Sequence, residues 1–328
     1  MTRPSAWSEW RPLAGIAPLT DAVLAETLDG GQAFRWHREA DGAWLGVWAN
    51  CVARVRLADD RGLEWSAPDA LAAHVAVALP EYLAVARNFD ALADSLPWRS
   101  DAHLAACLAE FRGLRILRQP FGETLLGFLC SATKQIVQIK PMLALLAERH
   151  GAEICRASVL QTPLPPSAAN GGCETDALRF HRLPTWAELA AISEAELRGC
   201  QLGFRARYIS ETAHFLAAHP GWLEETEAQP YPAAKARLCS LPGVGEKIAD
   251  CVLLFGAGRL EAFPVDTWIL KAMARRYGID GWRPAQVAQF GRAHFGPLAG
   301  FAQQFLFAYE RSLKNKPVYS EAMKPRKT

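Results

Sequence analysis

The stretch LCSLPGVGEKIADCVLLFGAGRLEAFPVDTW, residues 238–268, constrains the fold more than any other part of the chain. Gly243, Val244 and Gly245 form a short turn before a helix that we expect to begin near Glu246, because two glycines allow a tight bend and the close approach of another backbone. The preceding run YPAAKARLCS is typical of a helix, so a helix-hairpin-helix unit is predicted. Its turn and the N-terminus of its second helix suit a phosphate oxygen, and phosphate contacts hold a nucleic-acid strand without reading its sequence. A Gly-x-Gly pair alone would fit an ordinary helix connection; the full LPGVGxK string and the Ala-Asp after it favour the phosphate site.

Lys247 lies just inside this second helix, beside the apolar residues Ile248, Ala249 and Val252. A lysine on a helix surface is usually only solvated. In an apolar setting, loss of water lowers the pKa of an ammonium group, and the neutral amine can attack an electrophilic carbon and form a Schiff base. Lys247 is therefore the candidate nucleophile, and Cys251, one helical turn later, shares its face of the helix.

Asp266 directly precedes another helical pattern, TWILKAMARRYG. An aspartate in this position is a good N-cap, and that structural role is compatible with a catalytic one. We expect the helix N–H groups to keep the carboxylate ionised. It would then stabilise positive charge on a sugar ring or orient a nucleophile.

The composition and charge of the chain set broad limits. Its 328 residues are 50% hydrophobic, enough for a large core and two or three domains or subdomains. No apolar run reaches the length of a membrane span and the start MTRPSAWSEW has no signal-peptide core, so an intracellular protein without a membrane partner is expected. Residues 1–100 carry 9 Lys+Arg and 13 Asp+Glu, a net −4, and residues 101–328 carry the remaining 27 and 21, a net +6. This basic second part suggests a polyanion partner, although the charge alone favours an ordinary solvated surface.

The eight cysteines are scattered, and no two have the close spacing of a zinc ribbon or an iron–sulfur cluster. We therefore expect no metal site and reduced thiols that are mostly buried. No cofactor is expected to be required, apart from a structural monovalent cation that the hairpin turn could hold.

The pattern of the chain predicts an α+β fold: an N-terminal antiparallel β-rich domain over residues 1–110, then a two-part α-helical region over residues 111–328. The runs AWLGVWA, CVARVRLA and LEWSA are typical of short strands. The longest helical pattern is ETLLGFLCSATKQIVQIKPMLALLAERHG, which ends at a glycine. Three prolines and two glycines in QTPLPPSAANGG predict an exposed loop near residues 161–172.

The hairpin, Lys247 and the Pro-Val-Asp aspartate together resemble the helix-hairpin-helix Gly/Pro-Asp superfamily of DNA glycosylases, and within it the 8-oxoguanine DNA glycosylase/AP lyase branch. Four further stretches carry the finer match: GQAFRW at 31–36, FRGLRILRQ at 111–119, LGFRARYIS at 202–210 and AQQFLF at 302–307. The resemblance covers nearly the whole chain and includes the N-terminal domain that most of the superfamily lacks. It implies a bifunctional enzyme of base excision repair that acts on damaged duplex DNA.

The resemblance also implies roles for individual residues. The damaged nucleotide would be flipped out of the duplex, Lys247 would attack its anomeric carbon and form an imine, and β-elimination would cut the strand on the 3′ side. Asp266 would assist attack and departure of the base. Gly31 matches a glycine whose carbonyl accepts a hydrogen bond from the extra proton of oxidised guanine. Cys251 and Phe307 match the pair that sandwiches the base.

Further matches concern the edge of the base and the DNA around it. Gln303 matches the glutamine that meets the pairing edge of the base. Phe204 matches an aromatic wedge beside the vacated stack, and Arg205 an arginine near the orphaned partner base.

The chain departs from the family pattern where the partner base is read. Thr133 stands in place of an asparagine that contacts the orphaned cytosine, and Gln138 in place of an arginine that reads it. Because each such bidentate reader is worth about 1–3 kcal/mol of discrimination, we expect a relaxed preference for the base opposite the lesion. Trp268 replaces a histidine near the DNA, and Phe255 replaces a methionine near the wedge.

Two alternatives stay open on the sequence alone. A superfamily glycosylase for another damaged base, such as an alkylated purine, would use the aspartate with water as nucleophile, and Lys247 argues against it. A non-enzymatic DNA-binding protein could use the hairpin alone, but it gives no reason to keep Lys247, Cys251 and Asp266 together. A monomer is expected, located in the cytoplasm with the nucleoid if bacterial or in the nucleus if eukaryotic.

Overall fold

The computed structural model describes residues 5–158 and 177–315. The exposed loop predicted near residues 161–172 and residues 316–328 of the basic C-terminal segment lie outside this range. Within the described ranges, no helix is long and apolar enough to cross a bilayer.

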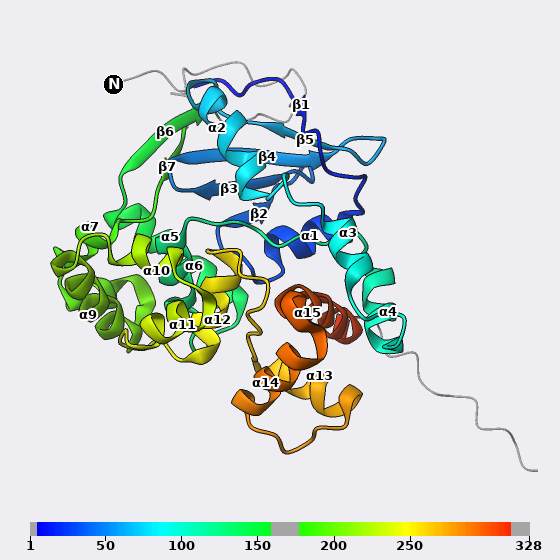
Figure 1. The fold of residues 1–328 in the computed structure, drawn as a ribbon. Coiled ribbons are helices and arrows are strands. Elements are labelled where there is room, and N and C mark those ends of the chain that lie inside the picture. The colour runs from blue at the N-terminus through cyan, green and yellow to red at the C-terminus, as the bar shows by residue number, and fades with distance from the viewer. Residues whose placement is uncertain (1–4, 159–176, 316–328) are drawn as a thin grey trace, which may run out of the picture.

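The N-terminal part is built on a five-stranded antiparallel sheet with the strand order β1-β5-β4-β3-β2 (Figure 1). Its strands are β1 (Arg11–Pro12), β2 (Trp36–Arg38), β3 (Trp44–Trp48), β4 (Cys51–Leu57) and β5 (Leu63–Ser66). The three predicted strand runs became β3, β4 and β5, which confirms the antiparallel sheet expected from them.

Alternating side chains of the sheet enter two different cores, as the two-residue period of a strand requires. Trp44 and Trp48 of β3 face the core shared with helices α1 (Asp21–Asp29) and α2 (Asp69–Tyr82). The intervening residues Leu45 and Val47 face a smaller core with Phe180. Phe180 belongs to a second, two-stranded sheet, β6 (Glu153–Ser158) with β7 (Ala177–His181), which the sequence analysis did not anticipate.

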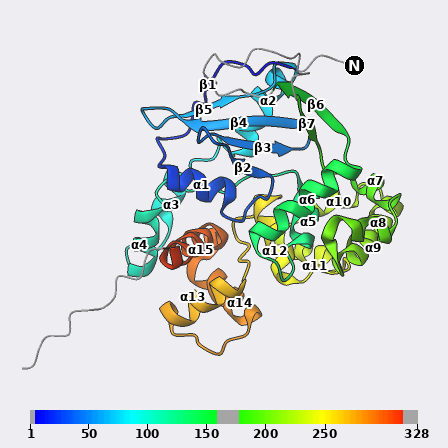
Figure 2. The same cartoon turned by 180° about the vertical axis from the view of Figure 1, so that it is seen from behind.

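The remaining described elements are helical, and they form two groups below the first sheet (Figures 1 and 2). One group runs from α5 to α12 and the other combines α3 and α4 with α13 to α15. The helices are α3 (Phe89–Ser95), α4 (Ala102–Glu110), α5 (Phe121–Cys130), α6 (Ile136–His150), α7 (Trp186–Ala190), α8 (Glu194–Leu197), α9 (Arg205–Ala218), α10 (Trp222–Ala228), α11 (Tyr231–Cys239), α12 (Glu246–Phe255), α13 (Thr267–Tyr277), α14 (Pro284–Phe295) and α15 (Ala299–Asn315).

Both groups of helices share one large apolar core. Phe89 of α3 and Leu104 of α4 belong to it, although both lie before residue 110. The domain boundary expected at residue 110 stays a prediction, because Phe89 and Leu104 before it pack in the helical core whereas Leu117 after it packs in the sheet core.

The longest predicted helical stretch is interrupted. It forms α5 and α6, separated by residues 131–135, and Thr133 in this break has a φ of +57°. Gly151 caps the end of α6 as expected. The break places Ser131 within hydrogen-bonding distance of Lys247 in the first turn of α12.

Candidate active site

The hairpin connects α11 to α12, and its two glycines have different structural reasons to be glycine. Gly243 has a φ of +76°, and a Cβ there would lie 2.7 Å from the ring of Tyr208. Gly245 is the N-cap of α12 and makes no side-chain capping hydrogen bond. Its φ is −91° and no heavy atom lies within 4 Å of a Cβ built there. Neither strain nor packing therefore requires a glycine at 245, whereas a ligand that approaches the helix N-terminus closely would require one.

Lys247 is half-buried in the first turn of α12. Its Nζ donates a hydrogen bond to Ser131 Oγ at 3.3 Å and lies 5.3 Å from the centre of the Phe128 ring. The amine thus sits against the end of α5 and an aromatic face rather than extending into bulk solvent. Cys251, one turn further along α12, is buried, and burial raises the pKa of its thiol to about 12 even though the nearby Lys247 charge lowers it.

Asp266 caps α13 through its side chain. Its Oδ1 accepts hydrogen bonds from the backbone N–H groups of Trp268 at 3.0 Å and Ile269 at 2.8 Å. Burial raises the pKa of this carboxyl, and these N–H groups and the positive charge of Lys247 oppose the rise only in part. The helix N–H groups alone predict a lowered pKa for this carboxyl, but burial acts in the opposite direction and is the larger effect. The resulting carboxylate is a better proton acceptor than a solvated aspartate.

The residues expected to hold the base come from distant parts of the chain. Gly31 follows α1 with a φ of +108°, and a Cβ built on it would lie 3.7 Å from Phe307 Cε1 on α15. The amide of Gln303, also on α15, donates to the carbonyl of Pro264 at 3.1 Å and accepts from Gln304 Nε2 at 2.6 Å. The structure thus places Gly31 beside Phe307, and connects Gln303 to the segment that carries Asp266.

The residues expected to contact the DNA around the lesion divide into two kinds. Phe204 is 50% exposed, as a wedge requires. Arg205, by contrast, is buried: its guanidinium donates to the carbonyls of Ala132 and Leu202 and, at 3.0 Å, to Thr133 Oγ1. Its predicted contact with the partner base stays a prediction, and its observed contacts hold the break between α5 and α6.

Both substituted partner-base positions are exposed and lie at this break. Gln138 Oε1 accepts from the backbone N–H of Gln135 at 3.1 Å, so the carbonyl end of its amide caps α6. Trp268 is half-buried in the first turn of α13, next to the Asp266 cap.

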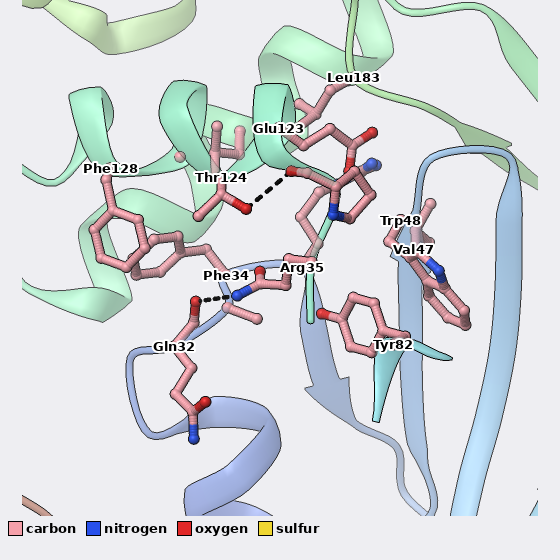
Figure 3. A pocket seen from close by; sticks show the side chains of 15 residues that line it. Gln32, Phe34, Arg35, Val47, Trp48, Tyr82, Glu123, Thr124, Phe128 and Leu183 are labelled. Atoms are coloured by element: carbon pink, nitrogen blue, oxygen red, sulfur yellow. Dashed lines mark hydrogen bonds between the residues drawn. The ribbon is translucent and has the colours of Figure 1, made fainter. Parts of the chain in front are cut away.

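A small cavity of about 30 Å³ lies behind this site, between the sheet and α5 (Figure 3). Phe128 lines it, and so do the half-buried charged side chains of Arg35 and Glu123. Burial lowers the pKa of Arg35 and raises that of Glu123, while each charge partly offsets the shift of the other. A volume of this size holds about one water molecule and no nucleobase.

Sequence reasoning missed Ser131 and Phe128, the two side chains that contact the Lys247 amine. Both lie in a run that was interpreted as one continuous helix. The serine after Cys130 was the available signal, since serine competes with helical hydrogen bonding.

Comparison with known proteins gives a consistent result over most of the chain. Residues 16–125 match the family described as 8-oxoguanine DNA glycosylase, N-terminal domain, and residues 130–294 match the HhH-GPD superfamily of base excision DNA repair proteins. The chain is 28% identical over 318 residues to the N-glycosylase/DNA lyase OGG1 of Arabidopsis thaliana, covering 92% of this chain and 80% of that protein. It is 29% identical over 287 residues to the N-glycosylase/DNA lyase of Saccharomyces cerevisiae, covering 80% and 70%.

Solved structures agree with these relatives. The 8-oxoguanine glycosylase/lyase of Clostridium acetobutylicum, in complex with double-stranded DNA containing cytosine opposite 8-oxoguanine, superposes with a TM-score of 0.77 at 26% identity, covering 94% of this chain and 99% of that one. A 3-methyladenine DNA glycosylase from Archaeoglobus fulgidus superposes with a TM-score of 0.66 at 20% identity, covering 93% and 99%, which shows a shared fold alone.

Proposed function

Because the chain belongs to the HhH-GPD superfamily of base excision DNA repair proteins and carries the N-terminal domain of the 8-oxoguanine glycosylases, we propose how its own residues carry out the reaction of that family. It is an 8-oxoguanine glycosylase/lyase of base excision repair. The observation that carries the assignment of its nucleophile is the placement of the Lys247 amine, against Phe128 and Ser131 and within electrostatic reach of Asp266.

In the proposed reaction, the neutral amine of Lys247 attacks C1′ of the flipped deoxyribose, and the glycosidic bond breaks with its electron pair leaving on the base. Asp266 accepts a proton from the attacking amine, for which its raised pKa suits it, and its negative charge opposes the positive charge that develops on the sugar. The C1′–O4′ bond of the sugar ring then breaks, O4′ takes the proton held by Asp266, and a protonated imine forms between Nζ and C1′. Removal of a C2′ proton then breaks the C3′–O bond and releases the 3′ phosphate side of the strand.

The DNA partner is proposed to be held by the hairpin and the wedge. The uncapped N-terminus of α12 at Gly245 supplies N–H groups to a phosphate, and the half-exposed Phe204 fills the space left by the flipped base. The Clostridium acetobutylicum glycosylase/lyase was crystallised with double-stranded DNA, which supports this choice of partner. A monomer suffices for these contacts.

Borohydride trapping tests the nucleophile. With a duplex containing 8-oxoguanine, reduction of the imine should leave a covalent protein–DNA adduct, and Lys247→Gln should abolish it. Lys271→Gln is the matched control, because Lys271 is exposed on α13, the helix that Asp266 caps. An adduct that persists in Lys247→Gln would assign the nucleophile to another amine, and a wild-type chain that binds the duplex without forming any adduct would favour a binding protein.

We also propose that the chain discriminates weakly among bases opposite the lesion. Thr133 Oγ1 accepts a hydrogen bond from Arg205, and Gln138 Oε1 accepts one from the α6 backbone, so both exposed side chains already use acceptor capacity within the protein. Excision rates should therefore be similar opposite cytosine, adenine, guanine and thymine. Gln138→Arg should restore a cytosine preference of about 1–3 kcal/mol. Val137→Arg is its control. Val137 is the adjacent residue and is 70% exposed, so an arginine there adds the same charge at a different position.

A further inference from the structure

Arg311 contacts both sides of the predicted base pocket. It lies on α15, one turn after Phe307, and its guanidinium carbon is 5.4 Å from the centre of the Phe307 ring. Its Nη1 also donates to the carbonyl of Gly30 at 2.6 Å, the residue that immediately precedes Gly31. Glu26 on α1 completes the contact, with an oxygen 3.0 Å from the same nitrogen.

The surroundings of Gly30 leave no room for a side chain at this position. Its N–H donates to the Glu26 carbonyl at 3.0 Å and ends α1. A Cβ at residue 30 would lie 2.1 Å from that carbonyl oxygen and 2.4 Å from Glu26 Oε1. Glu26 and Arg311 therefore both pack directly against the backbone of Gly30.

The residue after Gly31 is held equally firmly. The Gln32 carbonyl accepts from Gln119 Nε2 at 2.6 Å (Figure 3). The Gln32 side chain donates to the carbonyl of Arg115 at 2.8 Å and accepts from the N–H of Leu117 at 3.0 Å. Gly31 thus lies between two peptide groups that are fixed by hydrogen bonds, and within the described residues no group donates to its own carbonyl.

We propose that Arg311 is a positioning residue that determines lesion specificity: it fixes the Gly30–Gly31 peptide and the Phe307 ring relative to each other, and so aims the Gly31 carbonyl at the base. Within the described residues, the contacts of Arg311 are with Glu26, Gly30 and Phe307, and none is with Lys247 or Asp266. This inference rests on the proposed function, in which Gly31 meets the extra proton of the oxidised base. It predicts that loss of Arg311 harms recognition of the base more than chemistry at the sugar.

Two reactions of the same protein separate these effects. Excision of 8-oxoguanine under single-turnover conditions needs both the base pocket and Lys247, whereas cleavage of a duplex with a preformed abasic site needs Lys247 without a base. Arg311→Met should lower the ratio of the excision rate to the cleavage rate by about tenfold, the equivalent of about 1.4 kcal/mol. Arg311→Lys, which can still donate to the Gly30 carbonyl, should recover part of that ratio.

Arg38→Met is the matched control. Arg38, the last residue of β2, pairs with Asp21 at the other end of α1, so its loss removes an arginine–carboxylate pair on the same helix without touching Gly30. Its ratio should equal that of the wild type. An unchanged ratio in Arg311→Met, or an equal loss of both rates, would overturn the assignment. A wild-type chain that cannot cleave the abasic duplex would overturn the proposed function itself, and this inference with it.

Discussion

Replacing each hairpin glycine by alanine should separate folding from DNA binding. At residue 243 the left-handed φ of +76° disfavours alanine by at least about 1 kcal/mol, and the Cβ placed 2.7 Å from the Tyr208 ring adds about 1–3 kcal/mol of overpacking. Gly243→Ala should therefore destabilise the protein by about 2–4 kcal/mol. At residue 245 nothing lies within 4 Å of the added carbon. The poorer capping by alanine and the lower entropy of its unfolded chain offset each other, so Gly245→Ala should stay within about 1 kcal/mol of the wild type.

DNA binding should follow a different order. The methyl group at 245 occupies the space over the α12 N-terminus where a phosphate is proposed to sit, and hydrogen bonds to a charged group are worth about 1.5–3 kcal/mol. Gly245→Ala should thus weaken binding to a duplex with a tetrahydrofuran abasic analogue by about 10- to 100-fold.

Urea unfolding followed by tryptophan fluorescence measures the first effect, and fluorescence anisotropy of a labelled duplex at constant salt measures the second. The reasoning fails if Gly245→Ala binds DNA as tightly as the wild type. It also fails if Gly245→Ala is destabilised as strongly as Gly243→Ala.

Three further predictions concern other features of the structure. Thr133 is a β-branched residue at a φ of +57°, so Thr133→Asn should raise the free energy of unfolding by about 1 kcal/mol in urea titrations, and a loss of stability would contradict this view of the break. Burial raises the pKa of Glu26 from 4.5 to about 7, which means that the folded state binds its proton more tightly and that stability falls as pH rises through this window. Relative to Glu26→Gln, the wild type should lose up to about 3 kcal/mol between about pH 4.5 and 8, and parallel pH profiles of the two proteins would refute the shift. The Cys251 thiol is buried with its pKa raised to about 12, whereas Cys239 is exposed. Iodoacetamide should therefore alkylate Cys239 before Cys251, as followed by mass spectrometry. Earlier modification of Cys251 would show that the site opens readily.

The local parts of the site could be predicted from the sequence because their signals are local. Lys247 and Gly245 belong to one short motif. Asp266 directly precedes a helical pattern, which is the position typical of an N-cap. Strands β3 to β5 could also be predicted from the sequence, because runs of strand-forming residues and the turns between them are short-range features.

The parts that escaped prediction depend on contacts between distant residues. Nothing in the sequence around Arg205 shows that its guanidinium faces inward to a carbonyl 73 positions away. The bond from Arg311 to Gly30 spans 281 positions, and its residues carry no shared periodicity. The break after α5 was missed because residues 131–135 contain neither proline nor glycine, so the serine after Cys130 was the only local signal. The contacts of Lys247 with Ser131 and of Arg205 with Thr133 involve residues more than 70 positions away.

The pairing of Gly31 with α15 has a consequence for how the protein is made. A ribosome that has translated as far as Tyr277 has already produced the turn proposed to bind a phosphate, the proposed nucleophile Lys247 and Asp266, but not the helix that carries Gln303 and Phe307. A nascent or prematurely released chain of that length would hold the proposed reacting groups without one wall of the proposed base pocket. Under the proposed function, synthesis of α15 is thus the step that completes the pocket.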